Sequence, residues 1–412
     1  MAAALGTSCA HKPEPVSLTL LNWNSGQGFE VDTAIVAGFT ERTGIAVKQI
    51  PGAENVTSQL GHTLQFLNRG ATEPDVMEVD VIWPGILAGG LIDLNPYAAT
   101  DARAHTAALV ANDTVGGRLV AMPSNLEIGV LYYRTGLLRK YGYTAPPSTW
   151  DELETMSRMI QAGERRRGKK EFWGYVWQGA ELEGLTCDAL EWQVSHGGGN
   201  IIESDGTISV DNPNTVRAFR RAARWVGTIS PPTVTSYAEE DSRNVFDIGN
   251  AAFMRNWTYA YALAQRPESA VRGNFDVTEL PSGGARHAGT LGGWQLGVSK
   301  YSTHVKEAVE LVRFLTSQDV ETRRSRVASL LPTIAAAYGD EGVRKRNPYM
   351  TWLKDRMPSL VVARPSTITG ARYGEVSKAY YRTVHAILMK KVDAADGVSM
   401  LAKKLRQITG FP

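Results

Sequence analysis

The chain has 412 residues, which is enough for two or three domains. Its 44 basic and 42 acidic side chains nearly balance, which argues against a nucleic-acid partner because such binding needs a concentrated basic face. Its seven histidines are scattered without metal-ligand spacing, no nucleotide-binding glycine motif follows a strand, and no apolar run approaches a transmembrane helix in length. We therefore expect no metal and no cofactor.

The N-terminus carries small residues directly before Cys9 and a polar, proline-containing stretch, residues 11–15, after it. This arrangement resembles the end of a bacterial lipoprotein signal, although a basic leader is missing. An ordinary cytosolic start is the alternative. We favour an exported protein on the outer face of the cell membrane, anchored by lipid on Cys9. Cys187, the second of two cysteines, would then have no disulfide partner.

The first 70 residues alternate between strand-like and helix-like patterns. Apolar runs at residues 16–23 and 45–50 predict strands. Helical spacing of apolar residues predicts a helix after each strand, one closed by Gly44 and the next by Gly70. The loop after the first strand is polar and glycine-bearing, and it contains Asn24 and Gln27, which are placed to offer hydrogen-bond donors.

A buried strand is predicted within residues 74–94, where a short apolar run ends at Trp83-Pro84. The resulting β-α-β-α-β order predicts a parallel sheet with right-handed crossovers. Ligands of such sheets bind beyond the carboxyl ends of the strands, and Asp80 lies near that end. One interpretation is an aspartate that caps the next helix. We favour the other, an acceptor for ligand hydroxyls.

Further along, two strand-like runs surround Pro123, and Thr149 with Glu152 forms a capping box that predicts a helix from Thr149. An apolar strand at residues 251–254 leads to Trp257, and a strand at residues 290–300 contains a Gly-Gly kink. The last part of the chain is predicted to be largely helical.

Several segments, in order and over most of the chain, together resemble the extracellular solute-binding proteins of bacterial ABC importers. They are APPSTWDEL, DNPNTVRAF, FDIGNAAFMRNW, GGWQLGVSKYSTHVKEAVELVRFLTS and SLLPT. The likeness is to the sugar-binding group related to maltose- and trehalose-binding proteins. The region around Asp80 also resembles the trehalose-binding lipoprotein of mycobacteria.

The resemblance implies an α/β, two-lobed periplasmic-binding-protein-like (type II) fold with a hinge and a central cleft. It places the lobe crossings near residues 123–127, 291–296 and 331–337. After a tether of residues 1–15, lobe 1 would comprise 16–122 and 297–335, and lobe 2 would comprise 123–296 and 336–412. The implied partners are a carbohydrate ligand and the permease subunits of an ABC transporter. We expect a monomer.

A sugar offers hydroxyl rims to carboxylates and amides, and apolar C–H faces to aromatic rings. Trp257 follows the strand after which relatives place a stacking aromatic, and Arg364 matches an R-P-x-T run of the mycobacterial relative. The predicted ligand-binding residues are Asn24, Gln27, Asp80, Glu127, Glu240, Trp257, Trp294 and Arg364.

Each of these residues also has a structural interpretation. Trp257 would serve as a core residue, and Gly292-Gly293 would bring backbone rather than the Trp294 ring to the ligand. The acidic run that contains Glu240 is typical of a solvated helix start. Arg364 would instead join the lobes by a salt bridge. Trp173 and Trp177 are weaker ligand candidates.

Two other functions stay open. Paired carboxylates beside tryptophans would also suit a glycoside hydrolase, but a barrel enzyme needs eight βα units and this chain shows two lobes with a helical end. A glycerophosphodiester or another polyol is the second alternative. A phosphodiester favours a cationic cleft, whereas the candidates apart from Arg364 are acidic or neutral. We favour a binding protein, not an enzyme, for a neutral disaccharide such as trehalose or maltose.

Overall fold

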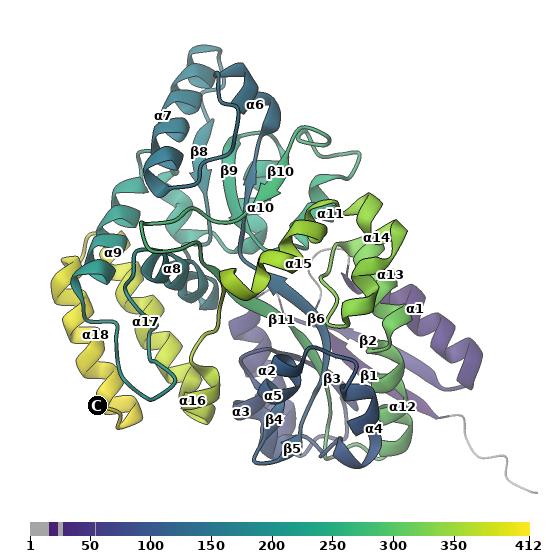
Figure 1. Ribbon diagram of the computed structural model, residues 1–412. Helices are drawn as coiled ribbons and strands as arrows, with labels where there is room; N and C mark the ends of the chain where they lie inside the picture. Colours follow the sequence, from purple (N-terminus) through teal and green to yellow (C-terminus); the bar gives the residue numbers. More distant parts are fainter. Residues whose placement is uncertain (1–15, 24–27, 54) are drawn as a thin grey trace, which may run out of the picture.

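The computed structural model describes residues 16–23, 28–53 and 55–412, and two open sheets flanked by helices organise it (Figure 1). A six-stranded sheet has the order β12 (Val361–Val362), β11 (Gly289–Val298), β3 (Val76–Asp80), β1 (Ser17–Asn22), β2 (Ala46–Pro51), with β6 (Met122–Ile128) pairing to β11. A four-stranded sheet has the order β10 (Asp276–Thr278), β7 (Val130–Tyr133), β9 (Ala251–Asn256), β8 (Trp173–Val176). Neither of these sheets closes into a barrel in the part of the chain described, so the eight-fold pattern of a barrel enzyme is not present there.

The six-stranded sheet begins as the sequence predicts. β1 (Ser17–Asn22), α1 (Gly28–Thr43), β2 (Ala46–Pro51), α2 (Val56–Asn68) and β3 (Val76–Asp80) follow in order, and β1 pairs in parallel with β2 and β3. Gly44 and Gly70 adopt φ values of 75° and 63° just after the two helices, a conformation that favours glycine. These predictions are confirmed.

The predicted parallel pairing is confirmed for β1, β2 and β3, whereas a strand from later in the chain enters the same sheet antiparallel to β3 and parallel to β12. β11 (Gly289–Val298) pairs antiparallel with both β3 and β6 (Met122–Ile128). β11 joins the sheet from far along the chain, and local periodicity carries no signal for such a pairing. Pro123 lies inside β6 rather than between two strands, opposite a β-bulge at Trp294/Gln295, where a missing N–H is tolerated.

The four-stranded sheet consists of β7 (Val130–Tyr133), β8 (Trp173–Val176), β9 (Ala251–Asn256) and β10 (Asp276–Thr278). The helices in this half are α6 (Thr135–Lys140), α7 (Trp150–Arg166), α8 (Glu183–Ser195), α9 (Pro213–Trp225), α10 (Glu239–Asp247) and α11 (Ala260–Ala264). The predicted capping box of α7 is confirmed, because the Glu152 N–H donates to Thr149 Oγ1 at 3.2 Å and the Thr149 N–H donates to Glu152 Oε2 at 3.1 Å.

The chain passes between the sheets where β6 continues through Gly129 into β7, and again where it enters β11. The two passages lie together, because the Gly129 N–H donates to the Thr290 carbonyl at 3.1 Å. After β11, α12 (Val305–Leu315) and α13 (Gln318–Ala328) pack on the first sheet's side. α17 (Tyr373–Leu388) and α18 (Ala394–Thr409) pack with α8 and α9 (Figure 1). The exact lobe boundaries remain a prediction.

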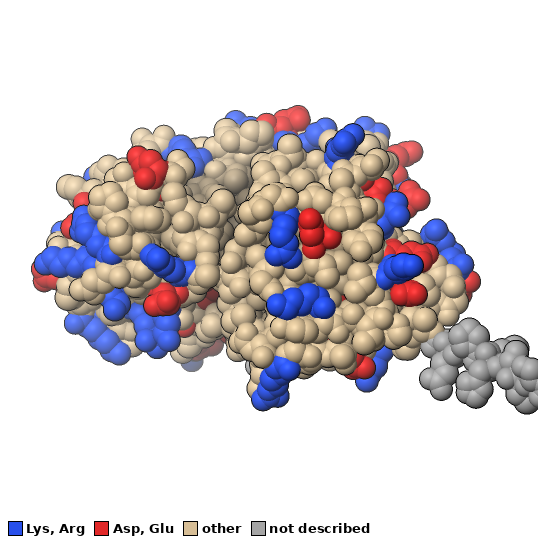
Figure 2. All heavy atoms as spheres, turned by 90° about the horizontal axis from the view of Figure 1, so that it is seen from below, with Lys and Arg blue, Asp and Glu red and all other residues tan. Residues whose placement is uncertain are grey.

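The remaining elements are short or lie between these halves. They are α3 (Pro84–Leu87), α4 (Asn95–Ala102), α5 (Ala107–Asn112), β4 (Thr114–Val115), β5 (Arg118–Leu119), α14 (Glu341–Arg346), α15 (Tyr349–Leu360), β12 (Val361–Val362) and α16 (Ser366–Thr369). Basic and acidic side chains are mixed over the face seen from below, which is hollowed between its two halves (Figure 2). Within the described ranges, none of the helices has both the length and the apolar character needed to cross a membrane.

Candidate ligand-binding cavity

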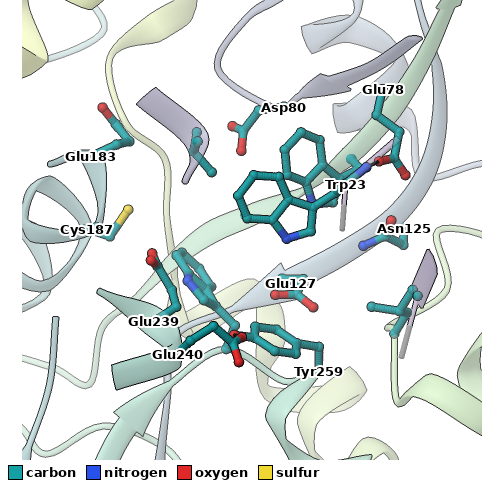
Figure 3. Close-up of a pocket in the computed structure, with 18 of the residues that line it drawn as sticks. Trp23, Glu78, Asp80, Asn125, Glu127, Glu183, Cys187, Glu239, Glu240 and Tyr259 are labelled. Atoms are coloured by element: carbon teal, nitrogen blue, oxygen red, sulfur yellow. Dashed lines mark hydrogen bonds between the residues drawn. The ribbon is translucent and has the colours of Figure 1, made fainter. Parts of the chain in front are cut away.

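A cavity lies between the two sheets, where the ends of β1, β3, β6 and β11 face α8, α10 and the residues after β9 (Figure 3). It contains about 1090 Å³ of empty space when its open mouth is included. The lining side chains are mainly aromatic or acidic: Trp23, Glu78, Asp80, Asn125, Glu127, Glu183, Glu239, Glu240, Trp257, Tyr259, Trp294, Arg324 and Arg364.

The predicted site residues that the structure describes all line this cavity, namely Asp80, Glu127, Glu240, Trp257, Trp294 and Arg364. Asn24 and Gln27 lie outside the described residues. Trp173 and Trp177 are not among the lining residues. Trp177 is fully buried and donates its Nε1–H to Ser230 at 3.0 Å, and Trp173 packs against Arg165, whose Cζ lies 4.3 Å from the ring centroid.

One wall of the cavity is an aromatic stack beside the first sheet. The rings of Trp23 and Trp294 stack with centroids 5.2 Å apart, and Trp83 meets Trp294 edge-on at 5.6 Å. Gly293 has a φ of 126°, and a Cβ there would lie 2.3 Å from the carbonyl oxygen of Asn125. Gly292-Gly293 therefore brings its backbone close to β6, while the Trp294 ring itself still reaches the cavity.

Two carboxylates enter the cavity from β3. Glu78 and Asp80 are two residues apart on one strand and so share a face. Burial raises the pKa of Asp80 to about 6, against the opposing effect of Arg364. Burial also raises the pKa of Glu78 to about 8, with a further contribution from Asp32. Asp80 Oδ1 accepts the Ile82 N–H at 3.1 Å, so it makes a local turn bond as well as facing the cavity.

β6 contributes Asn125 and Glu127, again two residues apart. Asn125 Nδ2 and Glu127 Oε1 are buried without a hydrogen-bond partner in the described part of the chain. Burial raises the pKa of Glu127 to about 8, although the Tyr259 backbone N–H and Arg255 oppose this shift. An unpartnered buried polar atom costs about 1–3 kcal/mol. A hydroxyl-bearing ligand would satisfy both atoms.

The opposite wall follows β9 and α10. The Trp257 side chain is 9% exposed, so it is largely buried yet still part of the cavity wall. The Tyr259 hydroxyl donates to Glu240 Oε1 at 2.7 Å, and Glu240 also pairs with Arg243, whose Nε lies 2.8 Å from Oε2. Glu240 is therefore held at the cavity instead of standing free in solvent. Burial raises the pKa of its neighbour Glu239.

Arg364 joins both sides of the cavity. Its Nη1 lies 2.8 Å from Glu183 Oε1 on α8, and its Nη2 lies 3.6 Å from Asp80 Oδ1 on β3. Nη2 also donates to the Leu291 carbonyl in β11 at 3.1 Å. The bridging interpretation of Arg364 is thus present in the structure. Its place in the lining leaves room for a ligand contact as well.

Several lining residues were not predicted. Glu78 and Asn125 each lie two positions from a predicted residue on the same strand, so strand alternation would have indicated them. Tyr259 lies in the helical turn that begins α11, so alternation gives no signal for it. Trp23 ends the first predicted strand. Glu183 has no local signal, because its partner Arg364 is 181 residues away. No three His, Cys, Asp or Glu side chains within the described ranges are grouped to hold a metal ion.

Comparison with known proteins identifies the family of this chain. Residues 23–322 match the profile of the bacterial extracellular solute-binding proteins. A probable ABC transporter-binding protein of Deinococcus radiodurans is 45% identical over 415 residues, which cover 99% of this chain and 98% of the relative.

Solved structures agree with this match. The maltose-bound protein T. maritima MalE3 is 36% identical with a TM-score of 0.90, covering 95% of this chain and 100% of that one. The acarbose-binding GacH receptor of Streptomyces glaucescens has a TM-score of 0.85 at 22% identity, covering 96% of this chain and 98% of that one, which shows the fold alone.

These matches confirm the two-lobed α/β fold. The relatives are binding proteins of ABC transporters, not enzymes, so the glycoside hydrolase alternative is not supported. A protein of this kind requires a ligand and permease partners, and its family is an extracellular one. The chain belongs to the bacterial extracellular solute-binding proteins of ABC transporters.

Proposed function

We propose that this protein captures a neutral disaccharide of the maltose or trehalose class in the cavity and delivers it to a membrane permease. The observation that carries the proposal is the pairing of aromatic surfaces on both walls with unpartnered polar atoms between them. A disaccharide has the matching surfaces, because its C–H faces pack on rings and its hydroxyls reach carboxylates and amides. The maltose bound by T. maritima MalE3, at 36% identity, supports the same class.

The roles follow from position. Trp257 would stack on one sugar face, and Trp294 with Trp23 would contact the other side of the ligand. Asp80 and Glu127 would accept hydrogen bonds from hydroxyls, as would Glu240 at the rim. Asn24 and Gln27 remain proposed donors from the first loop.

Charge favours a neutral ligand over a phosphodiester. Among the described lining residues the cations are Arg324 and Arg364. Arg324 is held by Asp32, with Nε 2.7 Å from Oδ1, and Arg364 is held by Glu183. A phosphate would therefore meet an acidic wall whose arginines are already paired, which is repulsive.

The cellular setting is part of the proposal. We infer an exported monomer, attached to the outer face of the membrane by lipid on Cys9, whose lobes move about β6 and β11 to enclose the ligand. Lipid on Cys9 would hold the protein close to its permease.

A thermal-shift screen tests the function. A ligand that binds the folded state raises Tm with concentration. Maltose, trehalose and sucrose are compared with glucose, mannitol and glycerophosphocholine, and the sugars are recovered to check for hydrolysis. We expect a concentration-dependent rise with one disaccharide, intact afterwards. The rise should vanish in Trp257→Ala and persist in the matched control Trp173→Ala. A rise in Tm with glycerophosphocholine alone would overturn the proposal. The absence of a rise in Tm with all of these compounds would also overturn it.

A further inference from the structure

A buried ion cluster lies beneath the Trp257 wall. Arg255 lies on β9, two residues before Trp257, which follows the strand, and it is 0% exposed. Its Nε lies 2.9 Å from Glu191 Oε2 and its Nη2 2.5 Å from Glu191 Oε1, while its Nη1 donates to Gln178 Oε1 at 2.9 Å. The guanidinium plane is therefore fixed on two sides, by Glu191 of α8 and by Gln178, which lies two residues after β8.

The cluster keeps a charged guanidinium. Burial alone would lower the pKa of Arg255, but Glu191 and Asp188 raise it. Burial raises the pKa of Asp188 well above its usual range, although its Oδ2 lies only 3.4 Å from Arg255 Nε. The cluster therefore places one guanidinium beside two carboxyl groups, those of Glu191 and Asp188. Nothing in the cavity's hydroxyl recognition requires this cluster.

The guanidinium contacts the Trp257 ring directly. Arg255 Cζ lies 4.2 Å from the ring centroid, within the range of a cation–π contact. On β11, a Cβ at Gly292 would lie 2.9 Å from Trp257 Cζ3, so the backbone there abuts the ring edge. The indole is thus contacted by a cation and by a glycine backbone, it donates a hydrogen bond to Glu239, and it lines the cavity.

Glu191 ties this support to the strands that pass between the sheets. Its Oε1 accepts the Thr290 N–H of β11 at 2.9 Å. A Cβ at Gly129, between β6 and β7, would lie 1.9 Å from the same Oε1. Arg255 is therefore anchored, through Glu191, where both passages meet.

We propose that Arg255, locked by Glu191, is a positioning residue for the ligand: it holds the Trp257 ring in its stacking orientation before the ligand arrives. The inference rests on the proposed function in that Trp257 contacts the sugar. A ring fixed in advance loses less conformational entropy on binding, which strengthens affinity. Lysine in place of Arg255 would retain the charge but not the planar fork that fixes the contact.

Fluorine NMR on protein labelled with 5-fluorotryptophan tests the ring's position without any ligand. The Trp257 resonance is assigned by its loss in Trp257→Phe. Two variants are compared: Arg255→Lys, and the double variant Arg255→Gln/Glu191→Gln, which removes one charge of each sign from the cluster. Asp188→Asn is the matched control, because it changes a carboxyl group of the same cluster and leaves the contact of Arg255 with the ring in place.

We expect the Trp257 resonance to shift or broaden in both Arg255 variants and to stay in place in the control. Affinity for the disaccharide found in the screen, measured by calorimetry, should fall about tenfold in the variants, as expected when a cation–π contact and a fixed rotamer are lost. Folded variants with an unmoved resonance or an unchanged affinity would overturn the proposal. If no carbohydrate binds the wild type, the proposed function fails, while the resonance still decides whether Arg255 fixes the ring.

Discussion

The two aromatic walls of the cavity rest on different supports. Trp294, beside the first sheet, packs on the rings of Trp23 and Trp83. Trp257, beside the second, packs on the guanidinium of Arg255 and the backbone of Gly292. One wall is thus supported by apolar surface, and the other by a buried charge that has its own partner.

Because the supports differ, the two tryptophans are expected to contribute differently to stability. Trp257 should serve ligand binding alone, whereas Trp294 should serve both ligand binding and stability. Removing Trp294 would leave two other rings without their contact, and unfilled space in a packed cluster is costly. Removing Trp257 would leave Arg255 still paired with Glu191, so the buried guanidinium keeps its partner. We therefore expect removal of Trp257 to weaken ligand binding with little loss of stability. Removal of Trp294 should weaken ligand binding and also lower the stability of the protein.

The largest expected effect comes from truncating the two rings. Trp257→Ala should weaken disaccharide binding by about 2–4 kcal/mol, as for a central hot-spot residue, with a small change in the urea midpoint. Trp294→Ala should weaken binding and also lower the free energy of unfolding by about 2 kcal/mol. Calorimetry and urea unfolding of both variants measure the two quantities. Equal losses of stability would contradict the proposed difference between the walls.

The carboxylate between the walls comes next. Asp80→Ala should weaken binding by about 2 kcal/mol, the value of a hydrogen bond to a charged group. Asp80→Asn serves as the control for the local turn, because its oxygen can still accept the Ile82 N–H. If Asp80→Ala binds the disaccharide like the wild type, Asp80 supports only the turn and its contact with Arg364.

A single methyl group tests the glycine support of Trp257. In Gly292→Ala the new Cβ would lie 2.9 Å from Trp257 Cζ3, so the ring must move. We expect a fall in affinity of about tenfold, which corresponds to about 1.4 kcal/mol. Gly89→Ala is the control, because a Cβ there has nothing within 4 Å. Similar affinities of the two variants in calorimetry would show that the ring tolerates displacement.

The smallest effect is a pH dependence of stability. The pKa of Glu127 is raised to about 8 from 4.5, so the folded state retains a proton that the unfolded state releases. Its stabilising contribution is complete below pH 4.5 and is lost as pH rises to about 8. Glu78, whose pKa is also raised to about 8, acts in the same direction. His196, with a pKa lowered to about 4 from 6.5, acts oppositely but only below pH 6.5.

Urea unfolding between pH 6.5 and 8 therefore isolates the carboxyl groups. Wild-type stability should fall with rising pH, and Glu127→Gln should fall less steeply. The difference should be below the roughly 1.4 kcal/mol per pH unit that one full proton carries. Parallel curves for the two proteins would show that Glu127 ionises in the folded state as it does in the unfolded chain.

Much of the fold follows from local patterns in the sequence. The strand and helix succession up to Asp80 and the start of α7 at its capping box depend on short-range chemistry, and both were predictable. The antiparallel insertion of β11 and the ion cluster around Arg255 depend on contacts between distant segments. Periodicity describes one element at a time, so it gives no register between elements.

The site divides in the same way. Family-like segments and isolated polar residues indicated Asp80, Trp257 and Arg364, which the structure brings to one cavity. Glu183 could not be found, because only folding places it beside Arg364. The supports of the two aromatic walls were equally inaccessible, since a ring's neighbours are decided by tertiary packing.

The pairing of β6 with β11 has a mechanical consequence. Two of the connections between the halves run through strands that are hydrogen-bonded to each other, β6 from Met122 to Ile128 and its partner β11. Shearing or twisting such a ladder breaks hydrogen bonds, whereas gentle bending preserves them. Any relative motion of the halves is therefore expected to bend this pair of strands. The stiffness of the strand pair against bending is set by residues that do not touch the solute, and it would help to determine how quickly the protein releases its ligand.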